Sequence, residues 1–292
     1  MKSNHAIRLL IAMLIASAAH SYGQSIGDIP LGQFYDHSMK EGKQPIPHLY
    51  LRESDVVWES ILWRTIDLHE RFNQFFYYPT EPEGSQGLLN FTNLIWNAAK
   101  NFQIPMYEDD EFKIPIDPDH YFTRYLTGDT VQLEIYDDEE GEEFHYETVV
   151  VPKIFYSEEI TRYYLKEACY IEKQTTGQNF RIIGLALIKD NYKTIDGEEE
   201  YMGSFPLFWI PFESLSVRRL LVRNEAYFED NIAHLPSWDE IFLTRTYSSF
   251  ISRESNRFNR SISDYLTGED AIMEADRIEE RLLDIEQDMW EY

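Results

Sequence analysis

The chain has 292 residues, of which 43% are hydrophobic and 15% aromatic, enough to bury the core of one large domain or two small ones. Its formal net charge of −26 repels nucleic acid and anionic lipid headgroups, so we expect no nucleic-acid partner and no direct membrane insertion. The single cysteine, Cys169, excludes an internal disulfide and any zinc site built on several cysteines.

Residues 1–23 have the pattern of a cleaved secretory signal peptide. A basic start precedes an apolar run from Leu9 to Ala19, and small residues lead to a cleavage site between Gly23 and Gln24. The run is far shorter than the roughly 20 residues that span a bilayer, which argues against the alternative of a transmembrane anchor. Cys169 lies far from this signal, so the sequence gives no N-terminal cysteine for a lipid anchor. We expect an exported chain that borrows any membrane attachment from a partner.

The N-terminal part of the mature chain changes from extended to helical. Residues 24–53 contain several prolines and glycines and few apolar repeats, which predicts an extended arm. Residues 54–76 place large apolar side chains at helical spacing and predict a helix. Further helices are predicted over residues 88–102 and 117–126.

The central part of the chain alternates instead. Residues 130–136 and 144–151 predict a β-hairpin around an acidic turn at 137–143. Residues 163–173 fit either a helix or a strand. Two segments of high apolar density predict strands of a buried sheet: residues 180–189 and 205–211.

The C-terminal part returns to helical spacing, with helices predicted over residues 213–224 and 238–254. Residues 267–292 predict an acidic amphipathic helix with a short heptad stripe of apolar residues, namely Ala275, Ile278, Leu282, Ile285 and Met289. The fold class is therefore α+β, with a single domain over residues 54–266 between the arm and the terminal helix.

Motifs that carry chemistry are absent from the sequence. We find no dinucleotide-binding or phosphate-binding glycine motif, no nucleophile elbow and no helical pair of histidines, so we predict no catalytic residue, no cofactor and no metal site. Cys169 is expected to be a buried, unreactive thiol. The isolated histidines are expected to be structural; they are His69, His120, His145 and His234.

Two residue classes leave alternatives open. Acidic runs at 108–111, 137–143 and 198–200 offer oxygen ligands for calcium but lack the spacing of an EF-hand loop, which favours solvated turns. Tryptophans can serve as sugar platforms, but most fall on apolar faces, which favours core packing. They are Trp58, Trp63, Trp96, Trp209, Trp238 and Trp290.

Three segments in this order resemble one known family. They are Asp55–Pro79 (DVVWESILWRTIDLHERFNQFFYYP), Arg181–Phe212 (RIIGLALIKD followed by FPLFWIPF) and Trp238–Tyr265 (WDEIFLTRTYSSFISRESNRFNRSISDY). Together they are similar to the gliding motility protein GldN, also called PorN, of the type IX secretion system. The resemblance covers nearly all of the mature chain, and the predicted signal peptide fits it.

The resemblance implies a non-catalytic structural subunit in the periplasm. Such a subunit assembles with a GldK/PorK-like outer-membrane lipoprotein into a ring and contacts the periplasmic part of a GldM/PorM-like motor protein. It also implies a homo-oligomer that is attached to the outer membrane only through the lipoprotein. The residues by themselves leave two competitors: a periplasmic glycan-binding or glycan-hydrolysing protein using aromatic platforms and paired carboxylates, and a calcium-binding adhesin-like module.

Overall fold

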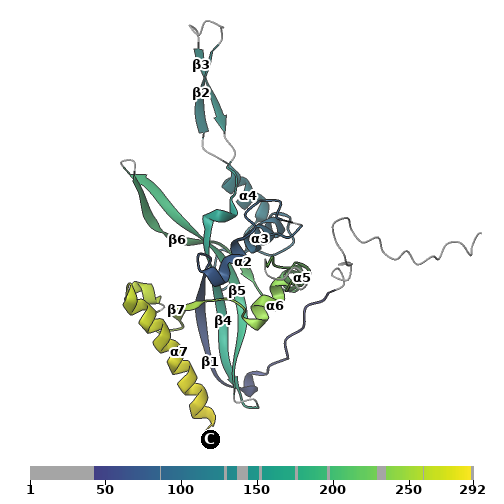
Figure 1. The fold of residues 1–292 in the computed structure, drawn as a ribbon, viewed down its shortest axis with the longest axis vertical. Coiled ribbons are helices and arrows are strands. Elements are labelled where there is room, and N and C mark those ends of the chain that lie inside the picture. Colours follow the sequence, from purple (N-terminus) through teal and green to yellow (C-terminus); the bar gives the residue numbers. More distant parts are fainter. Residues whose placement is uncertain are drawn as a thin grey trace, which may run out of the picture. The chain divides into compact units, whose positions relative to one another are not determined.

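The computed structural model describes residues 43–290 except 86, 128–129, 137–143, 151–152, 175–176, 196–197, 229–234 and 259. One compact unit, Gln44–Tyr292, contains every element discussed below (Figure 1). The predicted signal peptide, most of the predicted arm and the acidic turn at 137–143 lie outside the described residues.

A five-stranded antiparallel sheet in the order β6-β5-β4-β1-β7 forms the centre of this unit. Its strands are β1 (Val56–Asp67), β4 (Ile160–Glu172), β5 (Gln178–Ile195), β6 (Glu198–Pro211) and β7 (Phe250–Glu254). A second sheet has two strands, β2 (Thr130–Tyr136) and β3 (Phe144–Val150). The predicted hairpin and buried strands are therefore confirmed, and the ambiguous segment at 163–173 belongs to a strand.

The first predicted helix is wrong, because most of residues 54–76 form a short 3₁₀ turn, η2 (Glu53–Asp55), and then strand β1. Trp58, Leu62 and Ile66 are spaced four residues apart, which places them on one face of a helix. The same spacing also places them on one face of a strand, because every second residue of a strand points to the same side. Only the end of the segment is helical, as η3 (Arg71–Asn73) and α2 (Gln74–Tyr77).

The remaining helices pack mainly around the sheet. They are α3 (Phe91–Lys100), α4 (Pro118–Leu126), α5 (Leu215–Arg223), α6 (Trp238–Thr244) and α7 (Glu269–Trp290), with two further 3₁₀ turns, η4 (Ser157–Glu159) and η5 (Ile262–Asp264). The start of α3 is fixed by the Asn90 side chain, which accepts a hydrogen bond from the backbone N–H of Asn93 at 2.7 Å. The α+β fold class is confirmed.

The predicted helix over 238–254 is wrong in its second half. Helix α6 ends because Arg245 adopts a left-handed backbone conformation, with φ 56° and ψ 39°. The chain then turns, and residues 250–254 form strand β7 at the edge of the sheet beside β1.

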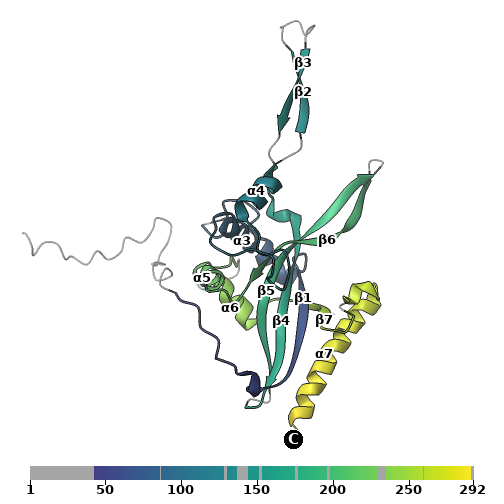
Figure 2. The same ribbon diagram turned by 180° about the vertical axis from the view of Figure 1, so that it is seen from behind.

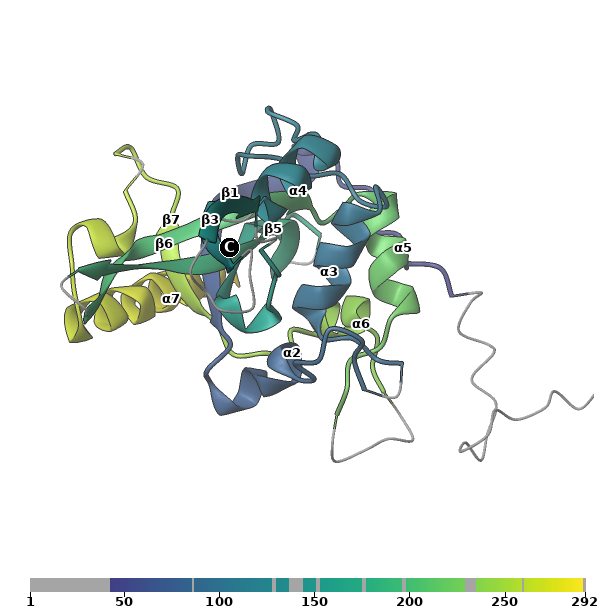
Figure 3. The ribbon, with the colours of Figure 1, turned by 90° about the horizontal axis from the view of Figure 1, so that it is seen from above.

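The main core lies where α2, α3, α5 and α6 cover one face of the sheet, and α3, α5 and α6 lie close together in Figure 3. Aromatic rings fill its centre: Phe76 packs on Trp238 with ring centroids 5.4 Å apart, and Phe91 packs on Phe242 at 5.2 Å. Such pairs stabilise a core beyond the area that they bury. This packing fixes the sheet and hence the surfaces around it.

A smaller core lies where α7 runs beside β7 and β1 (Figure 2). Leu62 of β1 and Cys169 of β4 contribute to it from the same sheet face as the main core, because cross-strand partners point to one side. Three residues of the predicted apolar stripe, Ala275, Ile278 and Leu282, are buried there. Helix α7 is thus packed on the sheet.

Candidate functional site

The acidic run at 108–111 is an ordered anchor on the opposite face of the sheet. Asp110 accepts a hydrogen bond from the indole Nε1 of Trp63 at 2.8 Å and pairs with Arg253 at 3.2 Å and Lys166 at 3.4 Å. Asp109 accepts hydrogen bonds from the backbone N–H groups of Ile114 and Lys113, and these bonds lower the pKa of its carboxyl group. Both carboxylates have protein partners, and no cluster of three metal-ligating side chains occurs among the described residues.

Among the other residue types singled out in the sequence, the cysteine and most described tryptophans are packed in the fold, whereas two of the histidines, His69 and His120, are exposed. Cys169 is fully buried, and burial raises the pKa of its thiol to about 12. His69 lies beside Asp67, His120 is exposed on α4, and the side chains of His145 and His234 are outside the described residues. Three tryptophans belong to the buried core: Trp96, Trp209 and Trp238. Trp58 and Trp63 are half-buried.

A buried ion network connects the sheet to α7. Glu167 of β4 is fully buried, and Arg245 Nη2 donates to its two carboxylate oxygens at 2.7 and 2.6 Å. Arg64 of β1 lies 3.4 Å from the same carboxylate through Nε and donates through Nη1 to Glu279 of α7 at 2.9 Å. Sequence reasoning missed this network, because its members come from four separate segments of the chain: β1, β4, the residue after α6, and α7. The signal in the sequence was that Arg64 and Glu167 occupy strand positions whose neighbours on the same face are apolar.

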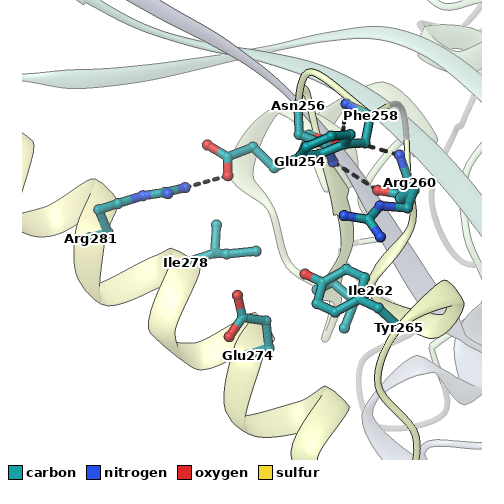
Figure 4. Close-up of a pocket in the computed structure, with 9 residues that line it drawn as sticks. All are labelled: Glu254, Asn256, Phe258, Arg260, Ile262, Tyr265, Glu274, Ile278 and Arg281. Carbon is teal, nitrogen blue, oxygen red and sulfur yellow. Dashed lines mark hydrogen bonds and ion pairs between the residues drawn. The ribbon is translucent and has the colours of Figure 1, made fainter.

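The α7 pocket, shown in Figure 4, is a concavity of about 210 Å³ between α7 and the chain after β7. Arg281 of α7 pairs with Glu254, and Arg277 donates to Glu274 at 2.6 Å. Across the pocket the guanidinium of Arg260 lies 4.6 Å from the Phe258 ring centroid and 5.7 Å from that of Tyr265. The lining residues are Glu254, Asn256, Phe258, Arg260, Ile262, Tyr265, Glu274, Ile278 and Arg281.

The chemistry of the α7 pocket suits binding better than catalysis. A glycosidase needs two carboxyl groups that are available to the sugar. Glu254 and Glu274 are instead each paired with an arginine of α7, Arg281 and Arg277. Exposed Phe258 and Tyr265 offer apolar faces to a ligand or a partner chain.

Besides the α7 pocket, a second exposed feature is the end of the predicted arm, residues 44–51. These residues form neither helix nor strand. Its backbone is fixed to the domain by two arginines: Arg218 Nη2 donates to the carbonyl of Ile46 at 3.2 Å, and Arg181 Nη2 donates to that of Leu49 at 3.1 Å. Arg218 is itself buried and paired with Asp239. The arm is therefore tied down through its carbonyl groups, with its apolar side chains left outside.

Comparison with protein families gives one match: the model described as gliding motility associated protein GldN covers residues 51–291. The chain belongs to the GldN family. This family is a component of the gliding motility and type IX secretion machinery. A comparison with curated proteins finds no match.

The GldN match spans the central sheet, both cores and α7, and it starts just after the exposed residues of the arm. Among the described residues of this GldN-family chain, no helix is long and apolar enough to cross a membrane. The α7 pocket and the end of the arm both combine exposed apolar side chains with ordered arginines. This is the composition of contact surfaces between proteins.

Proposed function

We propose that this chain is a non-catalytic structural subunit of the type IX secretion and gliding motility machinery, acting in the periplasm. Membership of the GldN family carries the proposal. The described part of the chain agrees with it, because Asp110 of the acidic run at 108–111 is paired within the fold, the thiol of Cys169 is buried, and Glu254 and Glu274 of the α7 pocket are paired with arginines.

In this proposal the subunit forms a ring with a GldK/PorK-like outer-membrane lipoprotein and contacts the periplasmic part of a GldM/PorM-like motor protein. The signal peptide predicted at residues 1–23 would deliver the chain to the periplasm, and the lipoprotein would hold it at the outer membrane. These partners follow from the sequence resemblance to GldN/PorN.

The contact surfaces that we assign to assembly are the arm, residues 24–53, and the C-terminal helix. Leu49 and Tyr50 are each 89% exposed although the arm backbone is hydrogen-bonded to the domain. Large apolar side chains that are exposed on an ordered backbone are typical of surfaces that a partner covers. On α7, Ile272, Met273 and Leu283 are likewise exposed.

Affinity purification of the full chain from detergent-solubilised envelopes of its host tests the proposal. We expect an outer-membrane lipoprotein and a single-pass inner-membrane protein to co-purify. A variant that lacks residues 24–53 is the matched comparison and should recover less of both. Recovery of neither partner with the intact chain would contradict the proposed function.

A second candidate function, glycan binding, is favoured by one observation: the α7 pocket combines two carboxylates with exposed Phe258 and Tyr265. Stacking of sugar rings on aromatic side chains would be the mode of binding. Co-sedimentation with purified cell-wall glycan distinguishes the two functions. Binding that Tyr265→Ala abolishes would favour this second candidate over the structural subunit.

A further inference from the structure

A groove of about 540 Å³ lies on the surface beside α2, away from both features described above. We call it the aromatic groove. Its lining contains five aromatic residues and one arginine, and consists of Arg71, Phe72, Gln74, Phe75, Tyr78, Tyr227, Phe228 and Thr246.

The floor of the aromatic groove is backed by the main core. Phe75 stacks on Phe228 with ring centroids 4.7 Å apart and packs on buried Trp238 at 6.3 Å. Phe72 and Tyr78 at the rim are 59% and 50% exposed. A packed floor with exposed aromatic rims is a surface suited to binding apolar side chains.

The arm has the residue spacing of segments that aromatic grooves bind. Pro45, His48 and Leu51 are half-buried and the residues between them are exposed, and this three-residue spacing matches the period of a polyproline II helix. Pro45 and Pro47 favour this conformation by fixing φ near −65° and restricting the residues before them. Proline-containing segments of this kind dock into aromatic-lined grooves.

The outward side of the arm is apolar throughout. Ile46, Leu49 and Tyr50 are exposed, and no carboxylate, lysine or arginine occurs between Gln44 and Leu51. Because two arginines already hold the arm backbone, little conformational entropy remains to be lost when a partner covers these side chains.

The arm and the groove of one copy are fixed at different places. Arg218 of α5 and Arg181 of β5 hold the arm, whereas the groove is lined from η3, α2 and the chain around 227–228 and 246. No described arm residue lines the groove.

We propose that the arm of one copy docks into the aromatic groove of the next copy. This contact rests on the proposed ring subunit and specifies which surfaces of the chain meet. It is heterologous, since two different surfaces of the same chain pair, and repetition of such a contact produces a ring or an open filament. One short segment buries too little area for a stable complex by itself, so the contact forms effectively when a partner holds the copies close together.

Cysteine cross-linking in the intact host envelope tests this contact, and the fully buried Cys169 provides a silent background. The full chain carries Tyr50→Cys together with Phe72→Cys, and in a second version Tyr50→Cys together with Tyr78→Cys. We expect a ladder of dimers and higher oligomers on non-reducing gels for at least one of the pairs. Each single substitution should give no ladder. The matched control joins Tyr50→Cys to Phe102→Cys, an exposed aromatic position that does not line the groove.

Two results would overturn the inference. One is a control ladder as strong as that of the groove pairs, and the other is the absence of a ladder from both groove pairs in chains that accumulate normally. Co-purification of the lipoprotein from the same envelopes separates these failures from failure of the proposed function. If the lipoprotein still co-purifies while both ladders are missing, the ring subunit stands and the arm binds elsewhere.

Discussion

At the scale of single residues, Glu167 is the most deeply buried charged side chain among the described residues. Its carboxylate is fully buried and faces Arg245 and Arg64. A buried charge that keeps its partners is tolerated, whereas removal of one partner leaves the others desolvated and unpaired. The fold therefore depends on this carboxylate more than on exposed acids elsewhere.

We predict that Glu167→Gln lowers the free energy of unfolding by about 3–5 kcal/mol, because two arginines lose their buried counter-charge. Urea unfolding followed by fluorescence would measure it. Glu111→Gln is the control, since Glu111 is exposed and should leave the unfolding midpoint unchanged. Equal midpoints for the parent and Glu167→Gln would contradict the prediction.

Asp190 holds the base of the β5–β6 hairpin, where that hairpin extends beyond its pairing with β4. Its carboxylate accepts hydrogen bonds from Ser204 at 2.6 Å, Thr161 at 2.9 Å and Arg162 at 3.0 Å. Burial by itself raises the pKa of Asp190, but these three donors outweigh it and hold the pKa below its ordinary value of 3.8.

A pKa that is lower in the folded chain means that the ionised form stabilises the fold at neutral pH, and that this stabilisation is lost as the pH falls below 3.8. We predict that Asp190→Asn costs about 1–3 kcal/mol at pH 7 and less as the pH approaches the folded-state pKa. Urea midpoints at pH 7, 5 and 3.5 measure the difference. A cost that stays constant with pH, or that Asp119→Asn on the surface of α4 reproduces, would rule this explanation out.

At the scale of elements, α7 is a helix of 22 residues with a small apolar attachment to the sheet. Ala275, Ile278 and Leu282 are its buried residues in the smaller core, and Glu279 and Arg281 add ion pairs to Arg64 and Glu254. Its stability thus depends on docking, as expected for a helix whose charged face repels itself.

We predict that Ile278→Ala costs about 2–4 kcal/mol, since it removes a buried side chain from a small core. Limited proteolysis should then cut α7 at Arg277 and Arg281 much faster than in the parent chain. Ile272→Ala, at an exposed position of the same helix, is the control and should digest at the parental rate. Similar digestion of both variants would show that α7 does not depend on this contact.

At the scale of the whole molecule, the net charge of −26 is the dominant long-range feature. A field of this sign attracts a basic surface, so we propose that the lipoprotein partner presents one. Exposed charges are screened over roughly 8–10 Å at physiological salt.

We predict that the affinity of this chain for the lipoprotein falls at least about tenfold between roughly 50 and roughly 500 mM NaCl. These concentrations span weak and strong screening of exposed charges. Surface plasmon resonance with the purified full chain would measure this, with the loss mostly in the association rate. Sodium sulfate at matched ionic strength distinguishes screening from a specific chloride effect. An affinity independent of salt would exclude charge pairing as the basis of the contact.

The sequence by itself determined the fold class, the β-hairpin and the apolar strands of the sheet, because dense apolar runs and strict alternation are local signals. The family followed from the resemblance of three segments to GldN/PorN, which the family match confirms. It failed for β1, where Ser60 and Arg64 interrupt the alternation of a strand. The charge of Arg64 is accommodated at this position because it pairs with Glu167 and Glu279, which are both distant in sequence. Local patterns cannot show such a partner.

Only the tertiary structure decided which surfaces remain open. The acidic run at 108–111 reads as a solvated turn, yet Asp110 is committed to Trp63, Lys166 and Arg253. The sequence predicts only that the arm is extended, and the structure adds that arginines from α5 and β5 fix its carbonyl groups. The aromatic groove joins residues that are more than 150 positions apart. Composition and spacing determine what each segment prefers locally, whereas long-range packing determines which side chains are used up inside the fold and which are left for a partner.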